Sequence, residues 1–251
     1  MTLLTDTHTH SEFVLKQRNT RWGRIFILGT GPSLLEQLPL LHKLKNEATF
    51  VCNTFFQWKE APFVPTYYGI SDIYDQHDIN ILADLIPSDV IAFNVQWEGY
   101  YNNPRFHYVC KAHDSQQVRG VGFVGLEETL PTVPTGRTTP LTLAQIAAWM
   151  GYREFYFLGC EQTRGYCHEP DAVVSGASRR RHEFPLDKNP KYRIAVRDCA
   201  RRMRADVEAQ GGRVYDCSPG GVMNSTGNQI HTGLPPVKPS LEYRDLKEVL
   251  G

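Results

Sequence analysis

Short apolar runs that alternate with helical stretches constrain the fold of this chain more than any other feature of its sequence. Each run is too short for a helix, is rich in β-branched or aromatic residues, and ends at Gly, Asn, Ser or Asp. Parallel strands need crossover helices, so this alternation is typical of a parallel sheet with helices on both faces. The predicted strands span 25–28, 50–52, 67–70, 90–93, 155–158 and 214–215; the predicted helices span 34–44, 80–86, 139–150 (with Thr139 as N-cap and Pro140 at the first helical position) and 196–207.

We therefore predict an α/β fold with a Rossmann-like, doubly wound, mostly parallel sheet and helices on both faces. Residues 95–138 are rich in aromatic residues, Gly and Thr without a clear period, which indicates a lid-like irregular insertion. The predicted organisation is an N-terminal arm over 1–22, one Rossmann-like domain over 23–222, and a C-terminal tail over 223–251 in which a short helix begins near Leu241.

Charge and composition exclude several classes of protein. The 27 basic residues balance the 27 acidic ones, so the chain is neither a wholly basic nucleic-acid coat nor an acidic solvating segment. No apolar run is long enough to cross a bilayer, and the N-terminus lacks the apolar segment of a signal peptide, which predicts a cytoplasmic protein. The six cysteines form no C-x-x-C pair, so we expect buried thiols rather than disulfides or a zinc ribbon.

The turn at Gly29-Thr30-Gly31-Pro32-Ser33 is the clearest local signal, because it joins a strand to a helix. Its glycines let backbone approach a ligand, and the helix offers free N–H groups and a positive dipole end to a phosphate. It is not a P-loop, and Leu34 replaces the third glycine of a dinucleotide fingerprint. Asn53 ends the second strand where an NAD enzyme prefers an acidic residue, which disfavours a dehydrogenase. The alternative is that the glycines only make a tight turn.

A second motif, Asp6-Thr7-His8-Thr9-His10, resembles the D-x-H-x-H that opens metal-dependent hydrolases on (β/α)₈ barrels. The residues before it are too few for a barrel strand, so the favoured interpretation is a solvated terminus that contains histidines. The chain has no D-x-D pair, the motif with which many nucleotide-dependent transferases hold a divalent metal. We therefore expect no bound metal.

Basic residues concentrate between 179 and 204, where ten Lys and Arg face three Asp and Glu. Arg193, Arg197 and Arg201 follow one another at four-residue steps on a predicted helix face, where they could meet a phosphate-bearing substrate or a nucleic acid. The alternative is an ordinary solvated face. His168 and His182 lie in the preceding polar loop, and each is either a general base or a surface histidine.

Several of these segments together resemble one superfamily. It groups bacterial CMP-sialic-acid-dependent sialyltransferases, motility-associated glycosyltransferases and archaeal 6-hydroxymethylpterin diphosphokinases, and the resemblance covers roughly residues 24–222. The segments that carry it are 24–33, the Cys52-Asn53 strand end, 67–72, Thr138-Thr139-Pro140, 151–161 and 216–221.

The resemblance implies roles for particular residues. Tyr156 matches one of two tyrosines that stabilise the departing phosphate; the second falls on Thr163, and nearby Tyr166 is a substitute for it. His182 fits the order of the catalytic histidine, and His168 is closer to its place in other branches. Thr30 stands where the sialyltransferases have Asn, so the donor can differ. The implied donor-binding residues are Gly29, Thr30, Gly31, Pro32, Ser33, Asn53, Asp72, Asn94, Thr138, Thr139, Glu161, Thr163 and Tyr166.

The favoured hypothesis is a metal-independent glycosyltransferase without a cofactor, which moves a sugar from a nucleotide sugar, CMP-sugars first, to an acceptor hydroxyl on a glycoconjugate or a hydroxylated DNA base. One alternative is a pterin-type diphosphokinase using ATP and Mg²⁺, with Asp72 and Asp75 as metal ligands. Another is a nucleic-acid-binding module. The expected partners are the nucleotide sugar, an acceptor or phosphate held by Arg179, Arg180, Arg181 and Arg193, and a second copy of the chain in a homo-oligomer.

Overall fold

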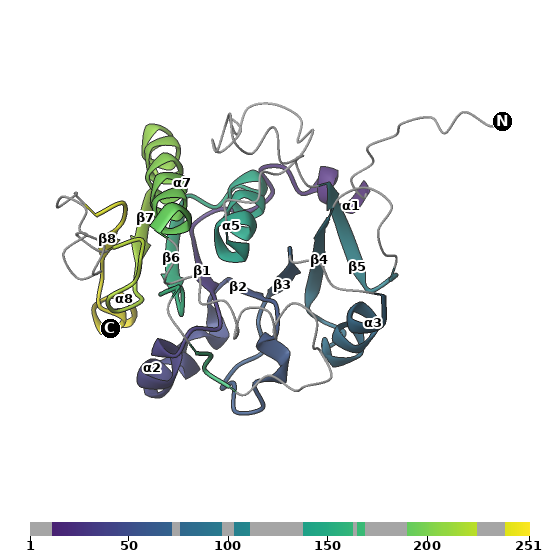
Figure 1. Cartoon of the computed structure of the whole chain (residues 1–251). Helices are drawn as coiled ribbons and strands as arrows, with labels where there is room; N and C mark the ends of the chain where they lie inside the picture. Colours follow the sequence, from purple (N-terminus) through teal and green to yellow (C-terminus); the bar gives the residue numbers. More distant parts are fainter. Residues whose placement is uncertain are drawn as a thin grey trace.

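The computed structural model describes residues 12–71, 76–96, 103–110, 138–162, 165–168, 190–224 and 239–251. They form one eight-stranded sheet in the order β5-β4-β3-β2-β1-β6-β7-β8, in which every neighbouring pair is parallel (Figure 1). The predicted α/β architecture is confirmed. The strands are β1 (Arg24–Leu28), β2 (Thr49–Cys52), β3 (Tyr67–Ile70), β4 (Ile91–Gln96), β5 (Phe106–Cys110), β6 (Glu154–Leu158), β7 (Arg213–Asp216) and β8 (Glu242–Tyr243).

The strand order reverses once, between β1 and β6. From β1 to β5 each strand is added on the same side of its predecessor, whereas β6 pairs with the other edge of β1. The loops after β1 and β6 therefore leave toward opposite faces of the sheet. In open parallel sheets this reversal opens a crevice at the carboxyl ends of the two strands, where ligands bind.

Helices cover both faces of the sheet, and each face has its own apolar cluster. Figure 1 shows α5 and α7 on one side of the sheet and α2 and α3 on the other. The central strands read as continuous apolar runs because both of their faces are buried. The helices are α1 (Glu12–Lys16), α2 (Ser33–Leu41), α3 (Gln76–Leu85), α5 (Thr139–Met150), α7 (Pro190–Ala209) and α8 (Leu246–Leu250), with the 3₁₀ turns η1 (His42–Asn46) and η2 (Phe55–Gln57).

Helix α5 is buried along its whole length, and apart from Gln145 and two threonines its residues are apolar, as is typical of a helix buried on all sides. Its N-cap is Thr138, one residue before the predicted Thr139, because the Thr138 hydroxyl accepts the Leu141 N–H at 3.3 Å. The helix ends at Gly151 in a left-handed conformation with φ 116°. A side chain there would overlap the Arg21 carbonyl, so the glycine lets residues 12–22 pack against the helix end.

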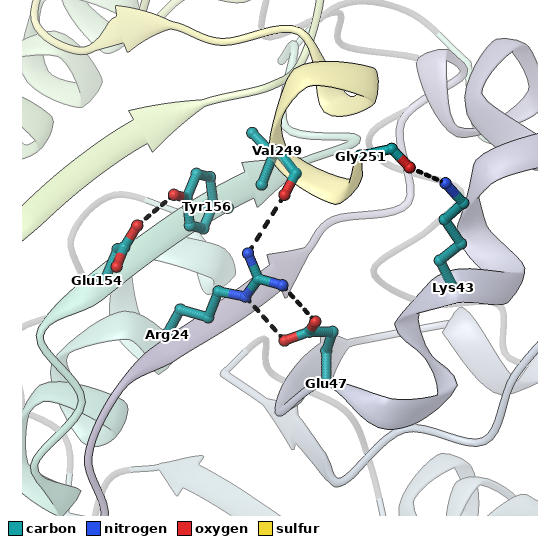
Figure 2. Close-up of polar contacts among 7 residues, drawn as sticks. All are labelled: Arg24, Lys43, Glu47, Glu154, Tyr156, Val249 and Gly251. Carbon is teal, nitrogen blue, oxygen red and sulfur yellow. Dashed lines mark hydrogen bonds and ion pairs between the residues drawn. The ribbon is translucent and has the colours of Figure 1, made fainter.

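The terminal segments are attached to the sheet. Residues 239–251, which the sequence places in a tail, add β8 beside β7 and place α8 against α2. Figure 2 shows how α8 is held: Arg24 bonds to both carboxylate oxygens of Glu47 and to the Val249 carbonyl, and Lys43 bonds to Gly251. The Arg24 guanidinium thereby joins the start of β1 to the end of the chain.

The edge strand β5 lies inside the region that the sequence predicts to be irregular. In β5 the partly exposed His107 interrupts an otherwise apolar run, as is usual for a strand that lies at an edge.

Two helices begin earlier in the chain than the sequence predicts: α3 begins at Gln76 rather than at residue 80, and α7 at Pro190 rather than at residue 196. The polar first turns of these helices carry no apolar period, so their starts were not readable from the pattern.

Leu246→Ala tests whether the C-terminal segment is part of the fold. Leu246 is only 1% exposed against the apolar cluster on the α2 face, so its truncation should lower the free energy of unfolding by about 2 kcal/mol or more. Urea denaturation measures the change. Leu250→Ala, on the same helix but partly exposed, is the control and should cost less than half as much. A loss below about 0.5 kcal/mol for Leu246→Ala would show that α8 is not integral to the domain.

Candidate functional site

The loops after β1 and β6 touch each other at the point where the strand order reverses. The Gly31 N–H donates to the Gly159 carbonyl at 2.9 Å, and the Gly29 N–H donates to the Leu158 carbonyl at 2.8 Å. A Cβ at Gly29 would overlap the Gly159 carbonyl, and one at Gly31 would overlap Glu161 Oε2. The glycines of the turn are therefore needed for the close approach of the β6 loop.

Glu161 occupies the N-terminus of α2. Its Oε1 accepts the Ser33 backbone N–H at 2.6 Å, while Oε2 has no hydrogen-bond partner, and the residue is only 4% exposed. A helix N-terminus attracts an anion through its free N–H groups and its dipole. The sequence predicts a phosphate at this position, and in the structure a carboxylate is already there. The Ser33 N–H is therefore already bonded and is not free for a phosphate.

The N-terminus of α5 lies at the same edge of the sheet, beside the ends of β2 and β3. Thr139 Oγ1 accepts hydrogen bonds from Asn53 Nδ2 at 3.3 Å and from the Ser71 hydroxyl at 2.8 Å. Asn53 has φ 52°, a left-handed conformation that Asn tolerates better than most residues. This backbone directs its amide toward Thr139, as the sequence motifs imply. Asn53 and Thr139 thus meet one strand away from the glycine turn.

Buried polar atoms without a hydrogen-bond partner gather at this carboxyl edge. Native proteins leave few such atoms, since each costs roughly 1–3 kcal/mol, so a cluster calls for an explanation. Within the described ranges the atoms at or next to strand ends are Ser33 Oγ, Asn53 Oδ1, Thr54 Oγ1, Glu161 Oε2, and both amide atoms of Asn94 and of Gln96. A bound polar ligand would satisfy them.

His168 lies next to the glycine turn. The backbone N–H of its neighbour Cys167 donates to the Thr30 carbonyl at 2.9 Å. The imidazole Nδ1 is 3.5 Å from Cys167 Sγ, Nε2 is buried without a partner, and the Tyr166 ring lies 6.0 Å away, centroid to centroid. Burial lowers the pKa of His168 below its ordinary value, so the ring is neutral at neutral pH. A neutral imidazole with a free nitrogen can accept a proton.

Tyr156 is separated from these residues. Its ring stacks between Phe26 and Tyr215, and its hydroxyl donates to Glu154, the first residue of β6 (Figure 2). Burial raises its pKa. The hydroxyl thus points toward the amino end of the strand, away from the crevice at the carboxyl end, and Tyr156 does not join the residues predicted with it.

Helix α7 brings two arginines to the same side of the sheet as α5. Tyr192 in its first turn donates to Gln162 Oε1 at 3.3 Å, which places the helix start beside the end of β6. The Nε atoms of Arg193 and Arg197 have no partner, and Arg197 is only 6% exposed. The alternative of an ordinary solvated face therefore does not hold at Arg197, whose pKa burial lowers. Farther along, Arg201 is paired with Asp198 within the helix.

A buried acid supports the loop behind Glu161. Asp216 is fully buried at the end of β7, where Oδ1 accepts the Ser218 N–H at 2.9 Å and Oδ2 accepts from Asn224 at 3.1 Å. The Ser218 hydroxyl in turn accepts the Cys160 N–H at 2.9 Å. Burial raises the pKa of Asp216 to about 7, with Glu161 adding to the shift. This network fixes the backbone from which Glu161 projects.

Other predicted residues lie outside the described ranges: His182, Asp72, Asp75, Thr163, Arg179, Arg180, Arg181 and the Asp6-His8-His10 motif.

The sequence analysis did not select Gln96, although its position two residues after Asn94 on the same strand was a usable signal. Within the described ranges no three His, Cys, Asp or Glu side chains converge in a way that would hold a metal ion. The buried cysteines there, Cys52, Cys160, Cys167, Cys199 and Cys217, are free thiols, as expected.

Comparisons with known proteins add a likeness to solved structures. No family model and no curated protein matches the chain. A variant of the sialyltransferase Cst-II in complex with CMP superposes with TM-score 0.48 and 16% identity, over 85% of this chain and 86% of that one. Sialyltransferase CstII from Campylobacter jejuni with the substrate analogue cytidine-5′-monophosphate gives TM-score 0.45 and 12% identity, over 87% and 86%. Among the described helices, none has the length and apolar character to cross a bilayer.

Asp216→Asn tests the buried acid. In the unfolded chain Asp titrates near pH 4, whereas in the folded protein it keeps its proton up to about pH 7. The wild type therefore loses stability as the pH rises between these values, by at most about 1.4 kcal/mol per pH unit, and the variant does not. We therefore expect the unfolding free energy of Asp216→Asn, relative to that of the wild type, to increase from pH 4 to pH 7 and to stay constant above pH 7. Urea unfolding at each pH measures it; a difference independent of pH would contradict the assignment.

Proposed function

We propose that this protein is a glycosyltransferase that binds a nucleotide sugar at the carboxyl edge of the sheet, between β1 and β6. The observation that carries the proposal is the set of buried, unpartnered polar atoms on Ser33 and Glu161, which flank the strand-order reversal, and on Asn53, at the end of the neighbouring strand β2. The sequence resemblance suggests the reaction class, since the glycosyltransferases of the superfamily that this chain resembles share the motifs in which these residues lie. The nucleotide sugar is a substrate in this scheme, and no resident cofactor takes part.

The donor phosphate would bind at the N-terminus of α5 rather than at that of α2. Glu161 repels a phosphate from the glycine turn, whereas α5 offers the Thr139 hydroxyl and the positive end of its dipole. Thr139 Oγ1 already accepts two hydrogen bonds, from Asn53 and Ser71, which leaves its proton to donate to a phosphate oxygen. Such a donor would stabilise the charge that develops on the leaving phosphate.

Glu161 would bind hydroxyl groups of the donor. Its Oε2 is buried and lacks a hydrogen-bond donor, while Oε1 is held by Ser33, so the carboxylate has a fixed orientation. A carboxylate accepts from ribose or sugar hydroxyls and repels phosphates. The N-terminus of α2 would thus bind hydroxyl groups of the ligand, and the N-terminus of α5 would bind its phosphate.

His168 would act as the general base. The acceptor oxygen attacks the anomeric carbon of the donor sugar, the bond from that carbon to the phosphate oxygen breaks, and its electron pair leaves with the phosphate. The acceptor proton passes to Nε2 of His168, which is neutral and unpartnered. His182, which the resemblance also favours, remains the alternative base.

The donor and acceptor are proposals from the sequence resemblance. CMP-sugars are the first donors to test, and a glycoconjugate or a hydroxylated DNA base is the expected acceptor. The pterin-type diphosphokinase is the second candidate, and it differs because transfer from ATP requires Mg²⁺. A panel of CMP-, UDP- and GDP-sugars and ATP, each with and without EDTA, separates the two by the nucleotide released. Release from a sugar donor in EDTA supports the glycosyltransferase, and EDTA-sensitive release from ATP alone contradicts it.

Glu161→Gln tests the hydroxyl-binding role. The amide keeps an acceptor for Ser33 N–H but replaces the second acceptor with a donor, so the dissociation constant of the active nucleotide sugar should rise about tenfold. Isothermal titration calorimetry measures it. Glu154→Gln, at the opposite end of the same strand, is the matched control and should bind like the wild type. Tighter binding by Glu161→Gln would mean that the phosphate lies at the glycine turn, against the proposal.

His168→Gln tests the base. Gln can hydrogen-bond but cannot take up the proton, so kcat should fall about 100-fold while KM for the donor changes little. Because the pKa of His168 lies below its ordinary value, the wild-type rate should hold at pH 7 and decline only below about pH 6.5. His42→Gln, an exposed residue of η1, is the control. A full rate in His168→Gln, with loss in His182→Gln, would move the role to His182.

A further inference from the structure

Two carboxamides on β4 are buried without hydrogen bonds. Asn94 is 0% exposed and Gln96 is 9% exposed, and all four of their amide nitrogen and oxygen atoms lack a partner. Each buried polar group left in this state costs roughly 1–3 kcal/mol relative to a satisfied one. No other strand of the described sheet carries two side chains of this kind.

The two amides share one face and one end of the strand. Residues two apart on a strand point the same way, so Asn94 and Gln96 form a row that ends at the carboxyl edge of the sheet. In the order β4-β3-β2-β1, three strand spacings of about 4.8 Å separate this row from the glycine turn, roughly 14 Å in all. It lies along the same edge as the proposed crevice but is a separate patch.

Folding alone does not account for these residues. Ile70, the partner of Asn94 on β3, and Ala92, two residues earlier on β4, are fully buried in the apolar cluster of that face. An apolar side chain of similar size at either amide position would pack there without an unsatisfied group, and such replacements are often neutral or stabilising. The amides therefore point to a ligand, because the sheet does not need them.

We propose that Asn94 and Gln96 bind a planar group in which a hydrogen-bond donor stands beside an acceptor. A carboxamide offers an oxygen acceptor and two N–H donors in one plane, so it pairs in a bidentate way with such a group, as Asn and Gln do with bases. A nucleobase has this chemistry at its pairing edge. The acylamino group of an amino sugar has the same donor and acceptor in one plane but on opposite sides, so each would bond to a different carboxamide. This assignment rests on the proposed function, because it adds a second ligand-binding patch at the same edge of the sheet. Its test does not depend on turnover.

Tyr108 supplies a flat wall for such a group. It is the β5 partner of Asn94, so the two side chains stand side by side on the same face. The Tyr108 hydroxyl accepts the Asn103 N–H at 2.7 Å, which holds the ring in place. Planar polar ligands are commonly bound by hydrogen bonds at their edge and by an aromatic ring at their face.

The first measurement is the stability of Gln96→Leu. If the amide exists for a ligand, its removal relieves an unsatisfied buried group, and the variant should melt at or above the wild-type temperature. Gln37→Leu is the matched control, because Gln37 is equally buried but donates to the Cys217 carbonyl at 2.7 Å, and it should melt lower. A lower melting temperature for Gln96→Leu would assign it a structural role and overturn the inference.

The second measurement is binding by NMR titration, with cytidine 5′-monophosphate and N-acetylglucosamine as probes and glucose and inorganic phosphate as probes that lack the paired group. We expect one of the first two to bind the wild type and to bind Gln96→Leu at least tenfold more weakly. Loss for the nucleotide identifies a base subsite, and loss for the amino sugar an acylamino subsite. Unchanged affinity in the variant, or no binding of either probe by the wild type, overturns the inference and leaves the glycosyltransferase proposal to its own turnover assay.

Discussion

The contact between the loops that follow β1 and β6 is the constraint on which the rest of the structure depends. These loops diverge to opposite faces of the sheet, yet the Gly31 N–H bonds to the Gly159 carbonyl and the Ser33 N–H bonds to Glu161. Both contacts require glycine in the turn, since a Cβ at Gly29 or Gly31 would overlap the β6 loop. Through them the first half of the chain is joined to the second at the site where a ligand would enter.

This contact also determines the chemistry available at the edge. Because the Glu161 carboxylate accepts the Ser33 N–H, the N-terminus of α2 is already occupied by a negatively charged group. The buried Asp216 and Ser218 network holds the backbone behind Glu161, so the carboxylate is oriented before any ligand arrives. Orientation of this kind reduces the reorganisation that binding and catalysis would otherwise require.

The sequence predicted the strands well and the site only in part. Central strands such as β1 and β6 are apolar on both faces, which makes them readable as short runs between turns, and Asn53 and Thr139 follow from their positions at strand and helix ends. Contacts between segments that are far apart in the chain could not be predicted from the sequence. Nothing local shows that Glu161, 128 residues after Ser33, caps α2, or that the Tyr156 hydroxyl points to the amino end of its strand.

The most direct test of the account is a crystal structure of the protein with cytidine 5′-monophosphate bound. The account predicts the phosphate at the N-terminus of α5, within hydrogen-bond distance of Thr139 or Asn53, and a nucleotide hydroxyl on Glu161, with the carboxylate still bonded to Ser33. A phosphate on the Ser33 N–H with Glu161 displaced, or a nucleotide bound away from the carboxyl edge of β1 and β6, would contradict it.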